Sequence, residues 1–578
     1  MGEGNNSRLR PLMLAGTGSD VGKSVIATAL CRIFLQDGYS PAPFKAQNMA
    51  LNSYATPDGL EIGRAQAVQA EAADIPCHSD MNPLLLKPQG NHTSQVILNG
   101  RPAGNRKASD YFRKEGREHL RGEVCAAFDR LASKYNPVVM EGAGSISELN
   151  LRESDLVNMP MALHAGAAVF LVGDIDRGGI FGSVYGSIAL LTPEERRHIK
   201  GIIVNKFRGD ISLFEGGRKQ LEEICGVPVL GVVPWFTDIR IDEEDSVALS
   251  GKATSAREGA INIAVVSLPH ISNFTDFNPL ERDPRARLYY ASSPEDIDAA
   301  DIVIIPGSKS TLADLDHIRR NGLAGAILRA DARGATILGI CGGYQMMGAE
   351  IRDPDHIEGE IALSPGLGLL PVSTTIRPEK RTLQTGFTLC GAGDADPGDG
   401  SNGSNGSNCS DGRNCGSPSS GSGSEKAGTG CNPPPDGVSG KGFAHCGAGD
   451  AGGGARRFTM RGYEIHMGES RPVEGAPESP LALLEDGRSD GYMLSGRCMG
   501  TYLHGILDNA PFVEFLLAPH IHKAAGTVEG QGEKEKSGRD ASGGDYAGYK
   551  ERQYDRLAEL VRTCLDMKKI YTILKSEL

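Results

Sequence analysis

The chain has 578 residues, of which 39% are hydrophobic, and a formal net charge of -13 at pH 7. This length is enough for roughly two to four domains with ordinary buried cores, and we expect two main domains with inserts. An acidic chain offers no basic footprint for nucleic acid or for an anionic membrane, so neither is expected as a partner.

Cysteine usage and apolar runs indicate the compartment. The twelve cysteines include no Cys-x-x-Cys pair, which argues against a secreted disulfide scaffold and against a zinc site. No signal-type segment opens the sequence, and the longest apolar run, residues 161–173, is shorter than the roughly 20 residues that cross a bilayer. We therefore expect a soluble, cytoplasmic protein, whose oligomeric state the sequence does not predict.

A glycine-rich loop lies near the start of the chain. An apolar run at residues 11–15 precedes Gly-Thr-Gly-Ser-Asp-Val-Gly-Lys-Ser at residues 16–24, and an amphipathic pattern continues to about Gln36. A strand, a loop with Gly-Lys-Ser and a helix in this order are typical of a phosphate-binding loop (P-loop). The residues that we expect to bind a nucleotide here are Thr17, Gly18, Val21, Gly22, Lys23 and Ser24.

The first domain should be a doubly wound α/β fold. Apolar runs at residues 138–140, 168–172, 202–204 and 229–233 alternate with helical stretches, which predicts a mostly parallel sheet whose ligands bind at the carboxyl ends of the strands.

Polar segments at 141–145, 174–179 and 205–210 follow three of these strands. We expect Glu141 and the Ser24 hydroxyl to bind Mg²⁺, which prefers oxygen ligands, and Asn205 to contact the nucleotide base. Each segment alone is also consistent with a solvated loop.

The domain boundary is predicted where the sequence becomes polar and acidic. The first domain is assigned to residues 8–240, a solvated linker to 241–259 and a second domain to 260–525, beginning with a strand at 261–266. A Gly-, Ser- and Asn-rich insert at 390–454 and a charged, Gly-rich insert at 526–548 are expected to be disordered. Residues 549–578 should hold one amphipathic closing helix, centred on 554–574.

The second domain carries a candidate nucleophile, Cys341. An apolar run at 335–338 enters Gly-Ile-Cys-Gly-Gly at 339–343, and small and apolar residues follow. This pattern predicts a strand, a sharp turn and a helix, the arrangement of a nucleophile elbow. A helix N-terminus beside the sulfur favours the thiolate. The alternative is a buried structural cysteine, which the flanking glycines make less favourable.

A nucleophile of this kind needs an oxyanion site and a base. The backbone N–H groups of Gly342 and Ser308 are candidates for the oxyanion site, because residues 302–308 read as a strand that ends in Pro-Gly-Ser. His504 and His466 both lie in strand-like segments downstream of Cys341. We choose His504 as the base.

These motifs resemble the cobyric acid synthases, the glutamine-hydrolysing amidotransferases of corrinoid synthesis. The resemblance extends over nearly all of the chain and includes residues 43–53, 81–88, 141–145 and 174–179. It implies an N-terminal domain of the dethiobiotin-synthetase type, in which threonine at the position of Thr17 is usual, and a C-terminal class I-type glutamine amidotransferase domain. Cys341 matches the nucleophile and His504 the partner histidine.

The resemblance implies ATP and glutamine as co-substrates, Mg²⁺ as cofactor and a corrinoid as the acceptor. The implied reaction is amidation of the b, d, e and g carboxylates of adenosylcobyrinic acid a,c-diamide. Arg64, Lys87 and Arg208 are candidate partners for these carboxylates, and each is equally consistent with surface charge. Many class I amidotransferases have a glutamate two residues after the histidine, but Ile506 occupies that position here, so no third catalytic residue is assigned.

Two alternatives remain open at this point. One is an amide ligase of the same build with another acceptor, such as cobyrinic acid a,c-diamide. The other is a P-loop ATPase switch with a degenerate amidotransferase domain. Such a switch usually carries an extra lysine early in the loop, where this chain has Gly16 to Gly18, and it has no use for Cys341 with His504.

Overall fold

The computed structural model describes residues 8–89, 93–107, 114–242, 251–390, 460–524 and 546–576. The predicted insert at 390–454 lies outside these ranges except for Cys390. The second insert lies outside them up to residue 545, and residues 546–548 are helical.

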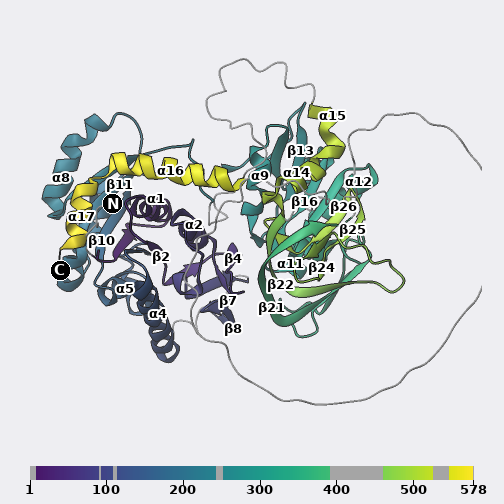
Figure 1. The fold of residues 1–578 in the computed structure, drawn as a ribbon, viewed down its shortest axis with the longest axis horizontal. Helices are drawn as coiled ribbons and strands as arrows, with labels where there is room; N and C mark the ends of the chain where they lie inside the picture. Colours follow the sequence, from purple (N-terminus) through teal and green to yellow (C-terminus); the bar gives the residue numbers. More distant parts are fainter. Residues whose placement is uncertain are drawn as a thin grey trace, which may run out of the picture. The chain divides into compact units, whose positions relative to one another are not determined.

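The first domain is built on a parallel six-stranded sheet, as the alternating pattern predicts (Figure 1). The strand order is β12-β11-β10-β1-β9-β2, and each neighbouring pair is parallel. Their bounds are β1 Leu12–Gly16, β2 Ala42–Phe44, β9 Val138–Glu141, β10 Ala168–Asp174, β11 Ile199–Phe207 and β12 Val229–Pro234. Both β1 and β10 are buried along their full length, as expected for strands with helices on both faces.

Helices connect and cover these strands. Their bounds are α1 Lys23–Gln36, α2 Arg64–Ala72, α4 Lys114–Lys134, α5 Met159–His164, α6 Ile180–Ala189, α7 Pro193–His198 and α8 Glu215–Cys225. Helix α1 begins directly after the glycine loop, at Lys23. The loop therefore lies at the carboxyl end of β1, an inner strand of the sheet, where ligands of doubly wound folds bind.

Two smaller sheets in the first domain were not expected from the sequence. One has the order β3-β6-β7-β8 and the other is the hairpin β4-β5. Their bounds are β3 Gln47–Met49, β4 Ser53–Ala55, β5 Glu61–Gly63, β6 Leu84–Pro88, β7 Thr93–Leu98 and β8 Arg101–Lys107. These short strands carry few strictly alternating residues, which is why periodicity alone did not reveal them.

The second domain contains another largely parallel sheet, of order β15-β13-β16-β18-β26-β25, in which β25 alone is antiparallel to its neighbour. Its strands are β13 Ile261–Val266, β15 Ala286–Ala291, β16 Ile302–Ile305, β18 Thr336–Ile340, β25 Tyr492–Ser495 and β26 Cys498–Thr501. A two-stranded sheet pairs β14 Ile271–Ser272 with β17 Gly307–Ser308. The helices are α9 Asn278–Arg282, α10 Pro294–Asp298, α11 Thr311–Arg320, α12 Leu323–Ala332, α13 Gly342–Met347, α14 Ala510–Leu517 and α15 Ile521–Ala524.

A third sheet is dominated by two long antiparallel strands, β21 and β22. Its members are β19 Glu350–Arg352, β20 Leu363–Pro365, β21 Val372–Leu389, β22 Met460–Pro472, β23 Ala482–Leu484, β24 Ser489–Asp490 and β27 Leu503–His504. Strand β22 pairs with β27, matching Tyr463 to His504. This pairing brings His504 to the same region as the Cys341 turn.

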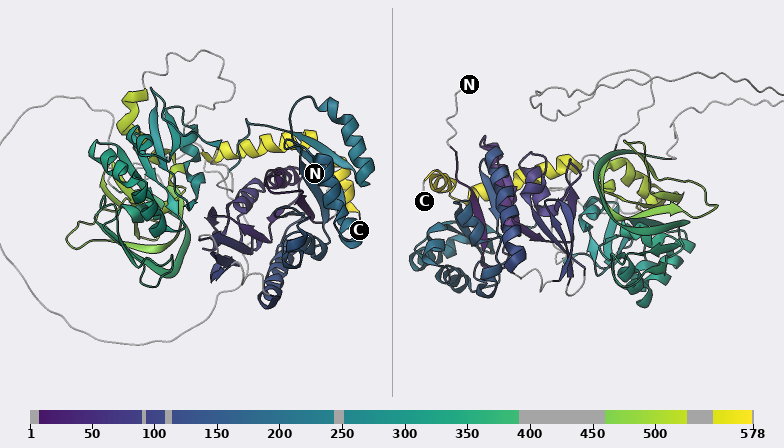
Figure 2. Two further views of the ribbon diagram at one scale, coloured as in Figure 1. Left: turned by 180° about the vertical axis from the view of Figure 1, so that it is seen from behind. Right: turned by 90° about the horizontal axis from the view of Figure 1, so that it is seen from below.

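The C-terminal segment corrects the prediction of a single closing helix. It forms α16, Tyr546–Cys564, and α17, Met567–Lys575. Leu565 forms a β-bridge with Gly231 between them, and the Asp566 side chain accepts the backbone N–H of Lys569 to cap α17. Both helices pack into the core of the first domain, and the views in Figure 2 show them, in yellow, against its purple and blue elements.

The linker prediction also needs a correction at Asp242. Its side chain is only 7% exposed and accepts a hydrogen bond from Arg64 Nη2 at 2.6 Å, so it is not part of a solvated segment. Residues 243–250 lie outside the described ranges. Among the helices of the described ranges, none is long and apolar enough to cross a membrane.

Candidate active site

The glycine loop encloses the amine of Lys23. Lys23 Nζ donates hydrogen bonds to the carbonyl oxygens of Gly18 at 2.9 Å and Gly144 at 3.1 Å. A Cβ atom on Gly16 would lie 2.7 Å from this amine, so a larger residue there would displace it. Thr17 forms a β-bridge with Ser145. The predicted loop residues therefore surround one cation at the end of β1.

Asn205 holds the loop from strand β11, which β10 separates from β1 in the sheet. Its Nδ2 donates to the carbonyl oxygen of Val21 at 2.8 Å, and a Cβ atom on Gly22 would lie 2.1 Å from that nitrogen. Gly22 also has a φ of 95°, which side chains disfavour. In this structure Asn205 shapes the loop backbone, and its expected contact with the base stays a prediction.

Glu141, at the end of β9, joins Ser24 of the loop to two further side chains. Its carboxylate accepts hydrogen bonds from Ser24 Oγ at 2.8 Å, Lys45 Nζ at 3.0 Å and Gln69 Nε2 at 2.7 Å. Sequence reasoning predicted the meeting of Ser24 with Glu141 but assigned no role to Lys45 or Gln69. Lys45 directly follows β2, the edge strand that pairs with β9. Knowing this strand order would have placed Lys45 near Glu141.

Burial and nearby charges shift the pKa values of Glu141 and Lys23. Burial raises the pKa of Glu141, but Lys45 and the hydrogen bonds from Gln69 and Ser24 outweigh it, so the pKa lies below 4.5. Burial lowers the pKa of Lys23 to about 8, although Glu141 acts in the opposite direction. The anionic Glu141 and the Ser24 hydroxyl are both hard oxygen donors, which fits the ligand preference of Mg²⁺.

Cys341 lies at a sharp turn between β18 and α13, as predicted. Its backbone has a φ of 52° and a ψ of -109°, a conformation rarely adopted by a side-chain-bearing residue. Its N–H donates to the carbonyl oxygen of Thr501 at 2.8 Å. A Cβ atom on Gly343 would lie 1.9 Å from the carbonyl oxygen of Ile305, so the glycine is needed for the turn to approach β16.

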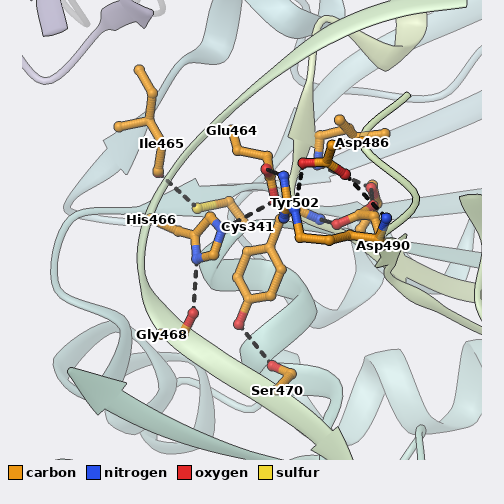
Figure 3. Close-up of polar contacts among 12 residues, drawn as sticks. Cys341, Glu464, Ile465, His466, Gly468, Ser470, Asp486, Asp490 and Tyr502 are labelled. Atoms are coloured by element: carbon orange, nitrogen blue, oxygen red, sulfur yellow. Dashed lines mark hydrogen bonds and ion pairs between the residues drawn. The ribbon is translucent and has the colours of Figure 1, made fainter. Parts of the chain in front are cut away.

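The sulfur of Cys341 faces strand β22. Sγ lies 3.6 Å from the carbonyl oxygen of Ile465 (Figure 3). A Cβ atom on Gly342 would lie 2.8 Å from the backbone nitrogen of Ser308, so the two predicted oxyanion donors lie on adjacent backbones. Ser308 is fixed by its own hydroxyl, which donates to Asp314 Oδ2 at 2.6 Å.

His504 has a carboxylate partner that sequence reasoning missed. Its Nδ1 lies 2.6 Å from Asp276 Oδ2, and the N–H of Gly505 donates to Asp276 Oδ1 at 3.2 Å. All of this is buried: His504 is 1% exposed and Asp276 5%. Asp276 lies in a short 3-10 helix, Phe274–Phe277, and it supplies a carboxylate beside His504 that Ile506 does not provide.

Asp276 changes the charge on His504. Burial lowers the histidine pKa, but the attraction and hydrogen bond of Asp276, together with the Cys341 thiol, raise it from 6.5 to about 10. Asp276 therefore favours the protonated form of His504.

His466, the other candidate base, has different partners. Its ring stacks on Tyr502 with centroids 3.8 Å apart, Nδ1 lies 2.7 Å from the carbonyl oxygen of Gly468, and Nε2 lies 3.4 Å from Glu464 (Figure 3). These contacts fix the His466 ring in the lining of a cavity. A cavity of about 1070 Å³ opens there, lined by Tyr344, His466 and Tyr502 and by charged residues of both signs.

The three candidate partners for substrate carboxylates are already engaged. Arg64 pairs with Asp242, and Lys87 Nζ contacts Glu61 at 2.9 Å, with all four side chains 7% exposed or less. Arg208 pairs with Asp176 and lies over the ring of Trp235 at 4.0 Å. Substrate binding is not favoured for Arg64 and Lys87, because it would require breaking a buried pair, whereas the Arg208 side chain is 56% exposed and fits the alternative of surface charge.

Comparison with known proteins assigns both halves of the chain. Residues 12–247 match the CobQ/CobB/MinD/ParA nucleotide binding domain, and residues 262–398 and 439–512 match the CobB/CobQ-like glutamine amidotransferase domain. With the P-loop and the Cys341 elbow, these matches define the class: a glutamine amidotransferase joined to a nucleotide-binding domain.

Similar sequences indicate which family of glutamine amidotransferases the chain belongs to. The chain is 57% identical to a cobyric acid synthase of Bacteroides fragilis, over 98% of this chain and 99% of the relative. It is 57% identical to one of Phocaeicola vulgatus and 43% identical to one of Photorhabdus laumondii, each over 98% of both chains. The chain belongs to the cobyric acid synthase family.

Proposed function

We propose that this protein uses ATP and glutamine to convert the b, d, e and g carboxylates of adenosylcobyrinic acid a,c-diamide into amides, giving cobyric acid. The observation that carries the proposal is the presence, in a chain of this family, of two intact centres: the Lys23 loop with Glu141, and Cys341 with His504 and Asp276. Eight cysteines in the described ranges are free thiols, which fits a reducing cytoplasm.

In the second domain, the Cys341 thiolate attacks the side-chain amide carbon of glutamine. The N–H groups of Gly342 and Ser308 stabilise the oxyanion. His504, protonated and held by Asp276, gives its proton to the leaving nitrogen, and ammonia departs. Water, which gives a proton to His504, then cleaves the glutamyl thioester, and glutamate, the thiolate and the protonated histidine are the products. The cavity beside Tyr502 is the proposed entrance for glutamine, since its charges of both signs fit a zwitterion.

In the first domain, a substrate carboxylate takes the terminal phosphoryl group of ATP. A carboxylate is a poor electrophile, and the acyl phosphate that forms reacts with ammonia to give the amide and release phosphate. Lys23 and the loop N–H groups bind the transferred group, and Thr17, Gly18, Val21 and Gly22 shape the loop. Ser24 and Glu141 would hold Mg²⁺, which when bound neutralises phosphate charge. Asn205, at the end of β11, is the proposed neighbour of the base.

The test separates the two centres. The Cys341→Ala variant should lose amidation with glutamine but keep it with added ammonium salt, because the acceptor chemistry does not use the thiol. The Lys23→Ala variant should lose amidation with either nitrogen source while still hydrolysing glutamine. The assay is mass spectrometry of the corrinoid products. Glutamine-dependent amidation that persists without Cys341 would refute the assignment.

A further inference from the structure

A second cavity, of about 340 Å³, lies in the first domain beside the P-loop. Gly144 and Ser145 line it. The carbonyl oxygen of Gly144 accepts a hydrogen bond from Lys23 Nζ at 3.1 Å, and Ser145 is bridged to Thr17 of the loop. A group bound in this cavity therefore contacts residues that themselves touch the P-loop and the lysine that is proposed to hold the transferred phosphate.

Apolar side chains line the cavity and extend onto the surface. Leu86, Val96 and Leu156 are buried, whereas Met49, Leu149 and Leu151 are 60%, 52% and 44% exposed. Single exposed apolar residues are common, but several around one opening mark a site for a ligand or partner.

The lining offers little positive charge. Arg152 is the one lysine or arginine among its described residues, and it is paired with Glu195, which also lines the cavity. Glu148 and Asp155 add negative groups. The site is therefore built to contact an apolar surface rather than to attract carboxylates.

We propose that this cavity and its rim of Met49, Leu149 and Leu151 bind the corrin ring of the substrate. This inference rests on the proposed function, in which carboxylates on several edges of one ring must reach the same phosphate. Apolar contacts are non-directional, so the ring binds with different edges presented in turn. An ion pair to one side chain would instead fix a single edge. The apolar side chains of the cavity and its rim contact the ring itself, and the edge that faces the P-loop carries the reacting carboxylate.

The test compares exposed leucines at and away from the rim. Leu149→Gln and Leu151→Gln should each raise the KM for adenosylcobyrinic acid a,c-diamide about tenfold, the scale expected for one lost leucine contact, and the rise should be similar at every amidation step. Leu149→Met, which conserves volume, should leave KM near the wild-type value. Leu213→Gln is the matched control, since Leu213 lies in the same domain, 84% exposed and outside the cavity lining.

Initial rates at saturating ATP and glutamine, with each partly amidated product quantified by mass spectrometry, give the KM values. Glutamine hydrolysis by each variant checks that the fold is intact. If the KM is unchanged in both Leu149→Gln and Leu151→Gln, or rises at one amidation step only, the assignment of the cavity is overturned and the proposed function is not. A wild-type protein that does not amidate the corrinoid overturns the proposed function and this inference together.

Discussion

The charge on His504 depends on a residue 228 positions away, Asp276. Without this carboxylate, burial alone would lower the histidine pKa below 6.5. With it, the folded-state pKa is about 10. Because the folded pKa lies above the unfolded value, the pair stabilises the fold fully below about pH 6.5. That contribution is lost as the pH rises through about 10.

We predict that Asp276→Asn lowers the rate of glutamine hydrolysis by about 10²- to 10⁴-fold, since the amide neither stabilises the imidazolium nor holds its tautomer. Ammonium-dependent amidation should be unchanged. In calorimetry, the stability difference between wild type and variant should be larger at pH 6 than at pH 10. A difference that grows with pH would contradict the assigned ion pair.

At the scale of elements, the hairpin β4-β5 is held to strands from two sheets through Glu61. Its carboxylate contacts Lys87 on β6 and Lys380 on β21, and all three side chains are 6% exposed or less. Burial raises the pKa of Glu61, but the two ammonium groups outweigh it and hold the pKa well below 4.5. The β4-β5 hairpin makes two further contacts with the second domain: Ser53 N–H donates to Asn273 Oδ1 at 2.9 Å, and Gln384 Nε2 donates to the Ala55 carbonyl oxygen at 2.7 Å.

This arrangement predicts an asymmetry between two variants. Glu61→Gln removes the counter-charge of two buried lysines, and burial already lowers the pKa of Lys380 to about 7, so the variant should destabilise the protein by about 3–5 kcal/mol. Lys380→Met should cost clearly less, because Lys87 still neutralises Glu61. Denaturant unfolding followed by fluorescence measures both. If both variants lose the same free energy of unfolding, the Glu61 carboxylate is not the group that holds Lys87 and Lys380 together.

At the scale of the whole molecule, the C-terminal helix α16 completes the hydrophobic core around the N-terminal helix α1. Leu557 and Val561 of α16 are fully buried in one cluster with Ile26 and Leu30 of α1. Arg32 of α1 also pairs with Asp555 at 2.7 Å. Helix α1 starts at the P-loop, so its position depends on a segment more than 500 residues later.

We predict that Leu557→Ala destabilises the first domain by about 2–5 kcal/mol, the usual cost of such a cavity, and weakens ATP binding as α1 loosens. Glu559→Ala, on the exposed side of α16, is the matched control and should change neither property. Thermal unfolding with and without ATP gives both readouts. Wild-type stability in the leucine variant would show that α16 is not part of this core.

The sequence by itself determined the two sites that are contiguous in it. The P-loop at residues 16–24 and the elbow at 339–343 are each specified by a few neighbouring residues, because local turns require glycine where φ is positive or where another backbone approaches closely. The same holds for the alternation of strands and helices that predicts both α/β domains.

Only the tertiary structure decided which distant side chains meet. Asp276 beside His504, Lys45 and Gln69 on Glu141, and the pairing of Arg64 with Asp242 all depend on how elements pack. A buried charged group needs a counter-charge or hydrogen bonds, but the spacing of residues in the sequence does not identify the partner residue. For the same reason, residues expected to bind substrate turned out to be paired within the protein, and the apolar cavity beside Gly144 became visible only once the strands and loops around it were in place.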